Sequence, residues 1–190
     1  MPRRANVRPD EPGRERVLAA ALELFGERGY HATSIADIGE RAGIAKSVLY
    51  HHFGSKPGLF EEIAETQTRD LLAYVADALT DDPAESRVRA GVDAYLRFFE
   101  ERPAAWRLLL RDPPAEPALI AVHERLAAER ERALAELLAG VDKLRGRPDA
   151  VGLTGTAIRA FAAWWYEHRD VPRSAVTDAV MDVVHAGARR

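Results

Sequence analysis

Proline and glycine interrupt this chain at helix-length intervals, and this spacing limits the folds that it can adopt. The segments between these breakers are rich in Ala, Leu, Glu and Arg, which favour helix. No run of alternating β-branched residues bounded by turns predicts a strand. We therefore predict an all-α fold of about nine helices, in which an N-terminal three-helix domain precedes a larger helical domain.

The apolar spacing and the breakers give the expected bounds of these helices. In the first, Val17, Ala21, Leu24 and Phe25 lie on one face. Residues 1–11 hold two prolines and three arginines without an apolar stripe, and we expect a flexible arm there. The predicted helices span residues 12–28, 33–42, 46–52, 55–80, 85–101, 103–111, 115–142, 149–169 and 173–187.

The composition excludes several classes of protein. The chain has no cysteine, which excludes disulfides, thiolate metal sites and cysteine nucleophiles. No apolar run reaches the roughly 18–20 residues of a membrane span, and the N-terminus does not resemble a signal peptide, so we expect a cytoplasmic protein without membrane contact. The adjacent His51 and His52 diverge on a helix and cannot chelate one metal ion as an i, i+4 pair does. With no phosphate-binding loop or nucleophile motif, we expect neither an enzyme nor a cofactor.

Charge is divided unevenly along the chain, although the net value is −3. Residues 1–60 hold nine Lys and Arg against seven Asp and Glu, whereas residues 61–190 hold eighteen against twenty-three. A basic head on an acidic body indicates that only the head meets a polyanion.

Residues 33–53, TSIADIGERAGIAKSVLYHHF, predict two short helices joined by a tight turn at Gly43. Their apolar residues are spaced to form a small shared core, namely Ile35, Ile38, Ile44, Val48 and Leu49. This is the layout of a helix-turn-helix, whose second helix lies in the major groove of double-stranded DNA.

With Val48 and Leu49 turned inward, Lys46, Ser47, Tyr50 and His51 would face outward. A cation, a hydroxyl, a phenol and an imidazole suit contacts to phosphates and base edges. The alternative is structural: two short helices joined at a glycine occur in many helical proteins, and the Tyr-His-His run can be a half-buried face. From spacing alone both interpretations stay open.

Four motifs in order resemble the DNA-binding region of the TetR/AcrR-type transcriptional regulators. They are AALELFGERGY at 20–30, TSIADI at 33–38, AGIAK at 42–46 and LYHHFGSK at 49–56, closed by Leu59 and Phe60. The resemblance covers about a quarter of the chain, from Arg14 to about Ile63.

The resemblance implies DNA contacts at matching positions. Thr33 matches the threonine that caps the second helix and touches a phosphate, and Lys56 matches the lysine at the start of the fourth helix. The recognition-helix contacts would come from Lys46, Ser47, Tyr50 and His51. Ala45 stands where the family usually has serine or threonine, Gly39 where it has alanine, and Pro57-Gly58 where it has better helix formers. These three departures predict a DNA-binding head that is less rigid than is usual in the family.

The resemblance also implies that residues 12–54 form the DNA-binding domain and residues 55–190 a domain for ligand binding and dimerisation. Candidates to line an apolar ligand cavity are Tyr95, Phe98, Phe99, Trp106, Leu110, His123, Phe161, Trp164 and Trp165. The alternative for each aromatic residue is a place in the packed core. Candidates for the homodimer interface are Ala157, Ala160, Val176, Ala179, Val180, Val183 and Val184.

The resulting prediction is a dimeric repressor that binds a palindromic operator and leaves it when an unidentified small-molecule effector binds. An activator and a regulator that needs no ligand are alternatives within the same family. A helical adaptor that binds another protein is the alternative outside it.

Overall fold

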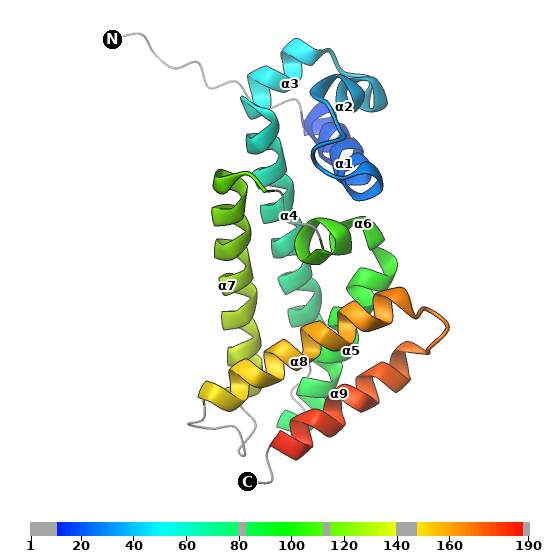
Figure 1. Ribbon diagram of the computed structural model, residues 1–190, viewed down its shortest axis with the longest axis vertical. Helices are drawn as coiled ribbons and strands as arrows, with labels where there is room; N and C mark the ends of the chain where they lie inside the picture. Colours follow the sequence, from blue (N-terminus) through cyan, green and yellow to red (C-terminus); the bar gives the residue numbers. More distant parts are fainter. Residues whose placement is uncertain (1–10, 80–82, 112–114, 140–147, 188–190) are drawn as a thin grey trace.

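The computed structural model describes residues 11–79, 83–111, 115–139 and 148–187. Within these ranges the regular elements are nine α-helices and one π-helical turn, with no strand (Figure 1). The all-α prediction is therefore confirmed. None of the helices in these ranges combines the length and the apolar character needed to cross a lipid bilayer.

The observed helices match the predicted ones closely. They are α1 (Glu11–Arg28), α2 (Ile35–Ala42), α3 (Lys46–Phe53), α4 (Lys56–Asp77), α5 (Ala84–Glu101), α6 (Pro103–Trp106), the π-helical turn η1 (Arg107–Arg111), α7 (Pro117–Ala139), α8 (Pro148–Glu167) and α9 (Arg173–Gly187). The helix predicted over 103–111 is one α-helical turn followed by η1. The predicted arm lies outside the described residues except for Glu11, which belongs to α1.

Helices α1, α2 and α3 form a small head around one apolar core. The predicted inward face of α1 is buried, from Val17 to Phe25. Ile35 and Ile38 of α2 and Leu49 of α3 close over it. This packing fixes the direction of α3, because a helix of eight residues is too short to be stable alone.

Helix α4 connects the head to the rest of the chain without a break. Ser55 caps its N-terminus by accepting a hydrogen bond from the Gly58 amide, and Pro57 sits in the first turn, where a missing N–H costs nothing. Leu59 and Phe60 pack into the head, while Leu71 is buried in the body. Helix α7 lies alongside α4 (Figure 1).

A second junction joins the head to the body at the C-terminal end of α1, which packs against α6 and η1. The Nη1 of Arg107 donates to the Gly26 carbonyl over 2.6 Å. On the other side, the Tyr30 hydroxyl donates to the Glu116 carboxylate over 3.3 Å. The head is thus held at two places besides α4.

Helices α8 and α9 pack on each other at the opposite end from the head, and α9 also packs on α5 (Figure 1). Arg173 of α9 pairs with Asp93 of α5 at 2.9 Å and also with Glu100. The Trp165 indole N–H donates to the Val171 carbonyl over 2.7 Å, which fixes the turn between α8 and α9.

The close approach at Gly26 predicts a loss of stability when a side chain is added there. A Cβ on Gly26 would lie 2.8 Å from the Cβ of Ala104 and 2.9 Å from its Cα. Overpacking costs about 1–3 kcal/mol and outweighs the gain in helix propensity of about 1 kcal/mol. We expect Gly26→Ala to lower the free energy of unfolding by about 1 kcal/mol in urea titrations.

The matched control is Gly152→Ala on α8, where an added Cβ meets no described atom within 4 Å. That substitution should raise the free energy of unfolding by about 0.5–1 kcal/mol. Equal stabilisation by both substitutions would show that α1 and α6 do not meet closely at Gly26.

Candidate nucleic-acid interface and ligand cavity

The turn between α2 and α3 is fixed by caps at both ends of α2. Ser34 accepts a hydrogen bond from the Asp37 amide over 3.1 Å, and the Asp37 carboxylate accepts one from the Ser34 amide over 2.7 Å. This capping box lowers the pKa of Asp37, chiefly through the hydrogen bonds with Ser34. Gly43 ends α2 with φ of 67°, a left-handed conformation that glycine adopts without strain.

The structure corrects the role of Thr33. Its side chain is only 1% exposed, and its hydroxyl donates to the carbonyls of Leu24 over 3.2 Å and Gly29 over 2.9 Å. The cap of α2 is its neighbour Ser34. The Thr33 hydroxyl instead ties the end of α1 to the start of α2, and Thr33 lines the same shallow cleft as Lys46 and Lys56.

Helix α3 presents most of its predicted contact residues to solvent. Lys46, Ser47, Tyr50 and His51 are exposed, while Leu49 is buried in the head. Val48, expected inward, is 40% exposed. Only the face that carries Leu49 and Phe53, four residues apart, meets the core, and Val48 is rotated about 100° from it. The exposed face of α3 therefore includes an apolar side chain.

Lys46 of α3 and Lys56, the first residue of α4, lie around one shallow cleft beside the first turn of α2. Lys46, Tyr50 and Lys56 line this cleft together with Ser34 and Ala36. The Lys56 ammonium lies 4.0 Å from the centre of the Tyr30 ring, and the Lys46 ammonium lies 5.7 Å from that of Tyr50. Burial lowers the pKa of Lys56, and the nearby Glu116 carboxylate opposes this shift. Two cations beside a helix N-terminus suit a phosphate.

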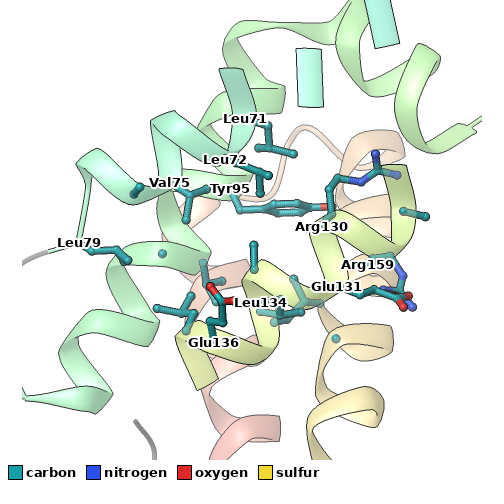
Figure 2. Close-up of a pocket in the computed structure, with 18 of the residues that line it drawn as sticks. Leu71, Leu72, Val75, Leu79, Tyr95, Arg130, Glu131, Leu134, Glu136 and Arg159 are labelled. Carbon is teal, nitrogen blue, oxygen red and sulfur yellow. Dashed lines mark ion pairs between the residues drawn. The ribbon is translucent and has the colours of Figure 1, made fainter. Parts of the chain in front are cut away.

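A cavity of about 570 Å³ lies among α4, α5, α7 and α8 (Figure 2). Three of the nine predicted lining residues, Tyr95, Leu110 and His123, do line it. Its walls are mostly aliphatic side chains that the sequence analysis did not single out, namely Leu71, Leu72, Val75, Leu79, Val92, Leu134, Leu137 and Ile158.

The other six predicted lining residues lie elsewhere, which corrects that assignment. Four belong to the packed core and two lie apart from the cavity, Phe161 half-buried against the core and Trp164 48% exposed. The core residues make edge-to-face contacts, such as that between Phe98 and Phe99, whose ring centroids lie 5.3 Å apart. These contacts bury the aromatic rings against one another in the core, away from the cavity. The four core residues are Phe98, Phe99, Trp106 and Trp165.

Polar side chains line the cavity from α5, α7 and α8. Tyr95 of α5 points its phenol toward Arg130 of α7 (Figure 2), and burial raises the pKa of Tyr95 to about 12. His123 of α7 also lines the cavity, and burial lowers the pKa of its imidazole. Among the described residues, no three His, Asp or Glu side chains gather as ligands for a metal ion.

The surface predicted for dimerisation is only partly exposed. Val176, Val180 and Val184 are buried within the single chain and cannot face a partner, because α9 turns them toward α5 and α8. Ala157 and Ala179 are half-buried. The exposed apolar side chains at this end are Leu153 (71%), Ala160, Trp164 and Val183 (37%).

Comparison with known proteins identifies the family. Residues 17–63 match the family of bacterial regulatory proteins named after tetR. The chain is 30% identical to the HTH-type transcriptional activator FasR of Mycolicibacterium smegmatis over an alignment of 190 residues. The alignment covers 97% of this chain and 87% of that protein. The chain belongs to the TetR family. It is therefore a DNA-binding transcriptional regulator with a helix-turn-helix in its head.

Two further proteins similar to this TetR-family protein differ in how much of the chain the similarity covers. The HTH-type transcriptional repressor KstR2 of Rhodococcus jostii is 45% identical over 58 residues, 30% of this chain and 28% of that one. A TetR-like regulator from Rhodococcus sp. RHA1 has the same fold, with a TM-score of 0.79 at 23% identity over 95% of this chain and 97% of that one. Sequence similarity to the repressor is thus confined to a short part of the chain, whereas the fold is shared along its whole length.

Sequence reasoning missed the functional candidates that are aliphatic or basic. Leu71, Leu134 and their neighbours look like ordinary core residues, because a cavity wall and a packed core require the same amphipathic spacing. The sequence did carry an indication for Arg130. It lies four residues after the buried Leu126, on the inward face of α7, where a charged side chain is unusual.

The uncapped N-terminus of α3 in this TetR-family protein predicts a stabilising substitution. Ala45 is the N-cap, with extended backbone and no side-chain hydrogen bond. A serine there can accept a hydrogen bond from the first turn, which is worth typically about 1 kcal/mol relative to alanine. We expect Ala45→Ser to raise the free energy of unfolding by about that amount and to slow amide exchange in α3.

The control is Ala36→Ser at an exposed position inside α2, which is expected to lower stability by less than about 0.7 kcal/mol. If Ala45→Ser leaves both the unfolding midpoint and the exchange rates unchanged, the first turn of α3 already has its amides satisfied in another way.

Proposed function

We propose that this TetR-family protein is a cytoplasmic homodimer that binds a palindromic operator through α3 and releases it when a small molecule fills the cavity. Residues 12–54 would form the DNA-binding domain, and residues 55–190 the domain for ligand binding and dimerisation. The carrying observation is the outward face of α3, beside a cleft that Lys46 and Lys56 both line. Since the similar proteins are regulators, we infer a regulatory and not a catalytic role.

The exposed side chains suit two kinds of DNA contact, to backbone phosphates and to base edges. Lys46 and Lys56, with the first turn of α2, suit backbone phosphates. Ser47 and His51 can donate and accept hydrogen bonds at base edges, and Tyr50 offers a flat face and a hydroxyl. The exposed Val48 adds an apolar contact of the kind made with a thymine methyl group.

A second copy of this chain is the partner that best fits the exposed apolar face of α8 and α9. Leu153, Ala160 and Trp164 recur at spacings of seven and four on α8, so they lie along one stripe. Val183 of α9 adds to the same end of the molecule. A twofold dimer through this face would carry two copies of α3, which can enter successive major grooves about 34–36 Å apart.

Hydrogen bonds connect the cavity to the head and support a ligand-dependent response. Arg130, which lines the cavity, donates to the Leu109 carbonyl in η1 over 3.5 Å. Arg107, at the start of η1, donates to the Gly26 carbonyl at the end of α1. A ligand that moves Arg130 or the neighbouring Leu110 would therefore act on the element that holds the head. Such a shift requires the ligand to bind the two states with different affinities.

Repression and activation are both candidates for the sign of the regulation. Repression follows directly from release of an operator on ligand binding, and KstR2, similar over 58 residues of this chain, is named a repressor. Activation is favoured by FasR, the relative that spans 97% of this chain. A promoter reporter carrying the selected operator distinguishes them: deleting the regulator raises expression for a repressor and lowers it for an activator.

Binding-site selection on random duplex DNA tests the DNA-binding proposal, and we expect a palindrome. Lys46→Ala combined with Tyr50→Ala should abolish specific binding of the selected duplex. Lys46→Ala alone should reduce the slope of log affinity against log salt by about one, because one phosphate contact is lost. Arg69→Ala, at an exposed position on α4 outside the head, is the control and should leave the slope unchanged.

In this experiment a helical adaptor would give a different result. If the Lys46→Ala, Tyr50→Ala double variant keeps its affinity for the selected duplex, α3 is not the recognition helix. The double variant should remain dimeric by light scattering, since both residues lie far along the chain from α8 and α9.

The dimer proposal predicts dissociation when charge enters the apolar stripe. Leu153→Glu replaces a side chain that is 71% exposed, so it should leave the fold of one chain intact while placing a carboxylate in the interface. We expect a monomer by light scattering, with unchanged helical content and weak operator binding. The control is Asp182→Asn, at an exposed polar position on α9. A Leu153→Glu variant that stays dimeric would move the interface away from this stripe.

A further inference from the structure

The cavity among α4, α5, α7 and α8 has mostly aliphatic walls. Leucine, valine, isoleucine and alanine side chains line it, and Tyr95 is its only aromatic lining residue within the described chain. Its volume of about 570 Å³ is in the ordinary range for small-molecule sites. Mostly aliphatic walls suit a hydrocarbon body better than a planar ring system, which gains from stacking on aromatic residues.

Three arginines line this cavity, namely Arg87, Arg130 and Arg159, and Arg130 lies near the phenol of Tyr95 (Figure 2). The Arg130 guanidinium donates to two neutral oxygens, the Thr68 hydroxyl over 3.2 Å and the Leu109 carbonyl over 3.5 Å. Among the described residues, no ion pair within 4.0 Å joins Arg130 to a carboxylate. Burial lowers the pKa of Arg130, and Arg159 lowers it further, while the charges of Tyr95, Glu129 and Glu131 oppose this shift. The charge thus lies in a poorly solvated place without a close counterion.

The carboxylates that line the cavity do not neutralise Arg130. Glu131 pairs with Arg159 over 2.9 Å. Glu136 lies six residues further along α7, about 9 Å away along the helix axis at 1.5 Å per residue. The other titratable lining residues are Arg87, Tyr95 and His123, and the pKa of His123 is lowered chiefly by burial and also by Arg130 itself. The surroundings of the guanidinium therefore favour an added anion.

We propose that the effector of this cavity is an aliphatic anion, whose carboxylate pairs with Arg130 while its hydrocarbon chain fills the space lined by the leucines. This inference rests on the proposed ligand-responsive function and specifies its ligand class. A cationic ligand would be repelled by Arg130, and a neutral one would leave the guanidinium without a counterion while displacing the water that solvates it. A bidentate pair between guanidinium and carboxylate removes that cost.

Three probes with the same ten-carbon body test the charge requirement, namely decanoate, decan-1-ol and decylammonium. Calorimetric titration of the full-length protein below the critical micelle concentrations should show decanoate binding at least about 10-fold more tightly than decan-1-ol, with decylammonium weakest. Equal affinities for the three probes, or no binding of decanoate, would overturn the proposal.

Substitution of Arg130 tests its role directly. Arg130→Gln should lower decanoate affinity by about 10- to 100-fold and change decan-1-ol affinity by less than about threefold. Arg130→Lys should keep part of the preference for the anion. The control Arg132→Gln removes an exposed charge from the same helix at a position that does not line the cavity, and should leave both affinities unchanged. Unchanged decanoate affinity in Arg130→Gln would overturn the proposal.

Operator binding separates failure of this inference from failure of the proposed function. The ligand-free wild type and the control Arg132→Gln should bind the selected duplex equally, and decanoate should release both at a concentration at which decan-1-ol releases neither. If the wild type binds the duplex but does not distinguish decanoate from decan-1-ol, only the ligand class is wrong. If it binds no duplex specifically, the proposed function fails irrespective of the ligand result.

Discussion

The close contact between Gly26 of α1 and the segment that runs from α6 into η1 determines how the head sits on the body. The absence of a side chain on Gly26 lets Ala104 approach, and this approach brings Arg107 within hydrogen-bonding distance of the Gly26 carbonyl. A larger residue at position 26 would separate the two helices and break that bond. Helix α4 and the Tyr30–Glu116 hydrogen bond are the other two connections, so the body cannot reorganise around η1 without affecting α1.

The orientation of α3 depends on this same anchoring of α1, and only weakly on α3 itself. Helix α2 has a capping box at one end and a left-handed glycine at the other, whereas α3 begins at the uncapped Ala45. Burial of Leu49 and Phe53 against the head is what fixes α3. A displacement of α1 at Gly26 would therefore change the packing that holds the recognition helix α3, since Leu24 and Phe25 belong to the same core.

The sequence predicted the helices and the head well, because caps, breakers and local spacing determine them. The predictions from sequence failed where two neighbouring residues fit the same local pattern equally well. Thr33 and Ser34 are both able to cap a helix, and the buried carbonyls of Leu24 and Gly29, which decide between them, come from another helix. Val48 and Leu49 are adjacent apolar residues, and only the packing of α3 shows which of them faces inward.

The body was harder to predict because apolar spacing does not reveal what an apolar face meets. The aromatic residues proposed for a cavity and the valines proposed for a dimer interface largely fill the core of one chain, since large apolar side chains gain most from complete burial. The cavity and the exposed stripe are made of residues such as Leu134 and Leu153, which the sequence does not distinguish from core.

Arg130 ties the chemistry of the cavity to the geometry of the junction. Its guanidinium lacks a close carboxylate among the described residues and hydrogen-bonds instead to the Leu109 carbonyl of η1, the element that also carries Arg107. A π-helical turn uses backbone hydrogen bonds less regularly than an α-helix and often marks a functional site. Any group that attracts the Arg130 charge more strongly than a neutral carbonyl would weaken this bond. The most polar point of an apolar cavity thus lies one short element away from the helix that positions the head.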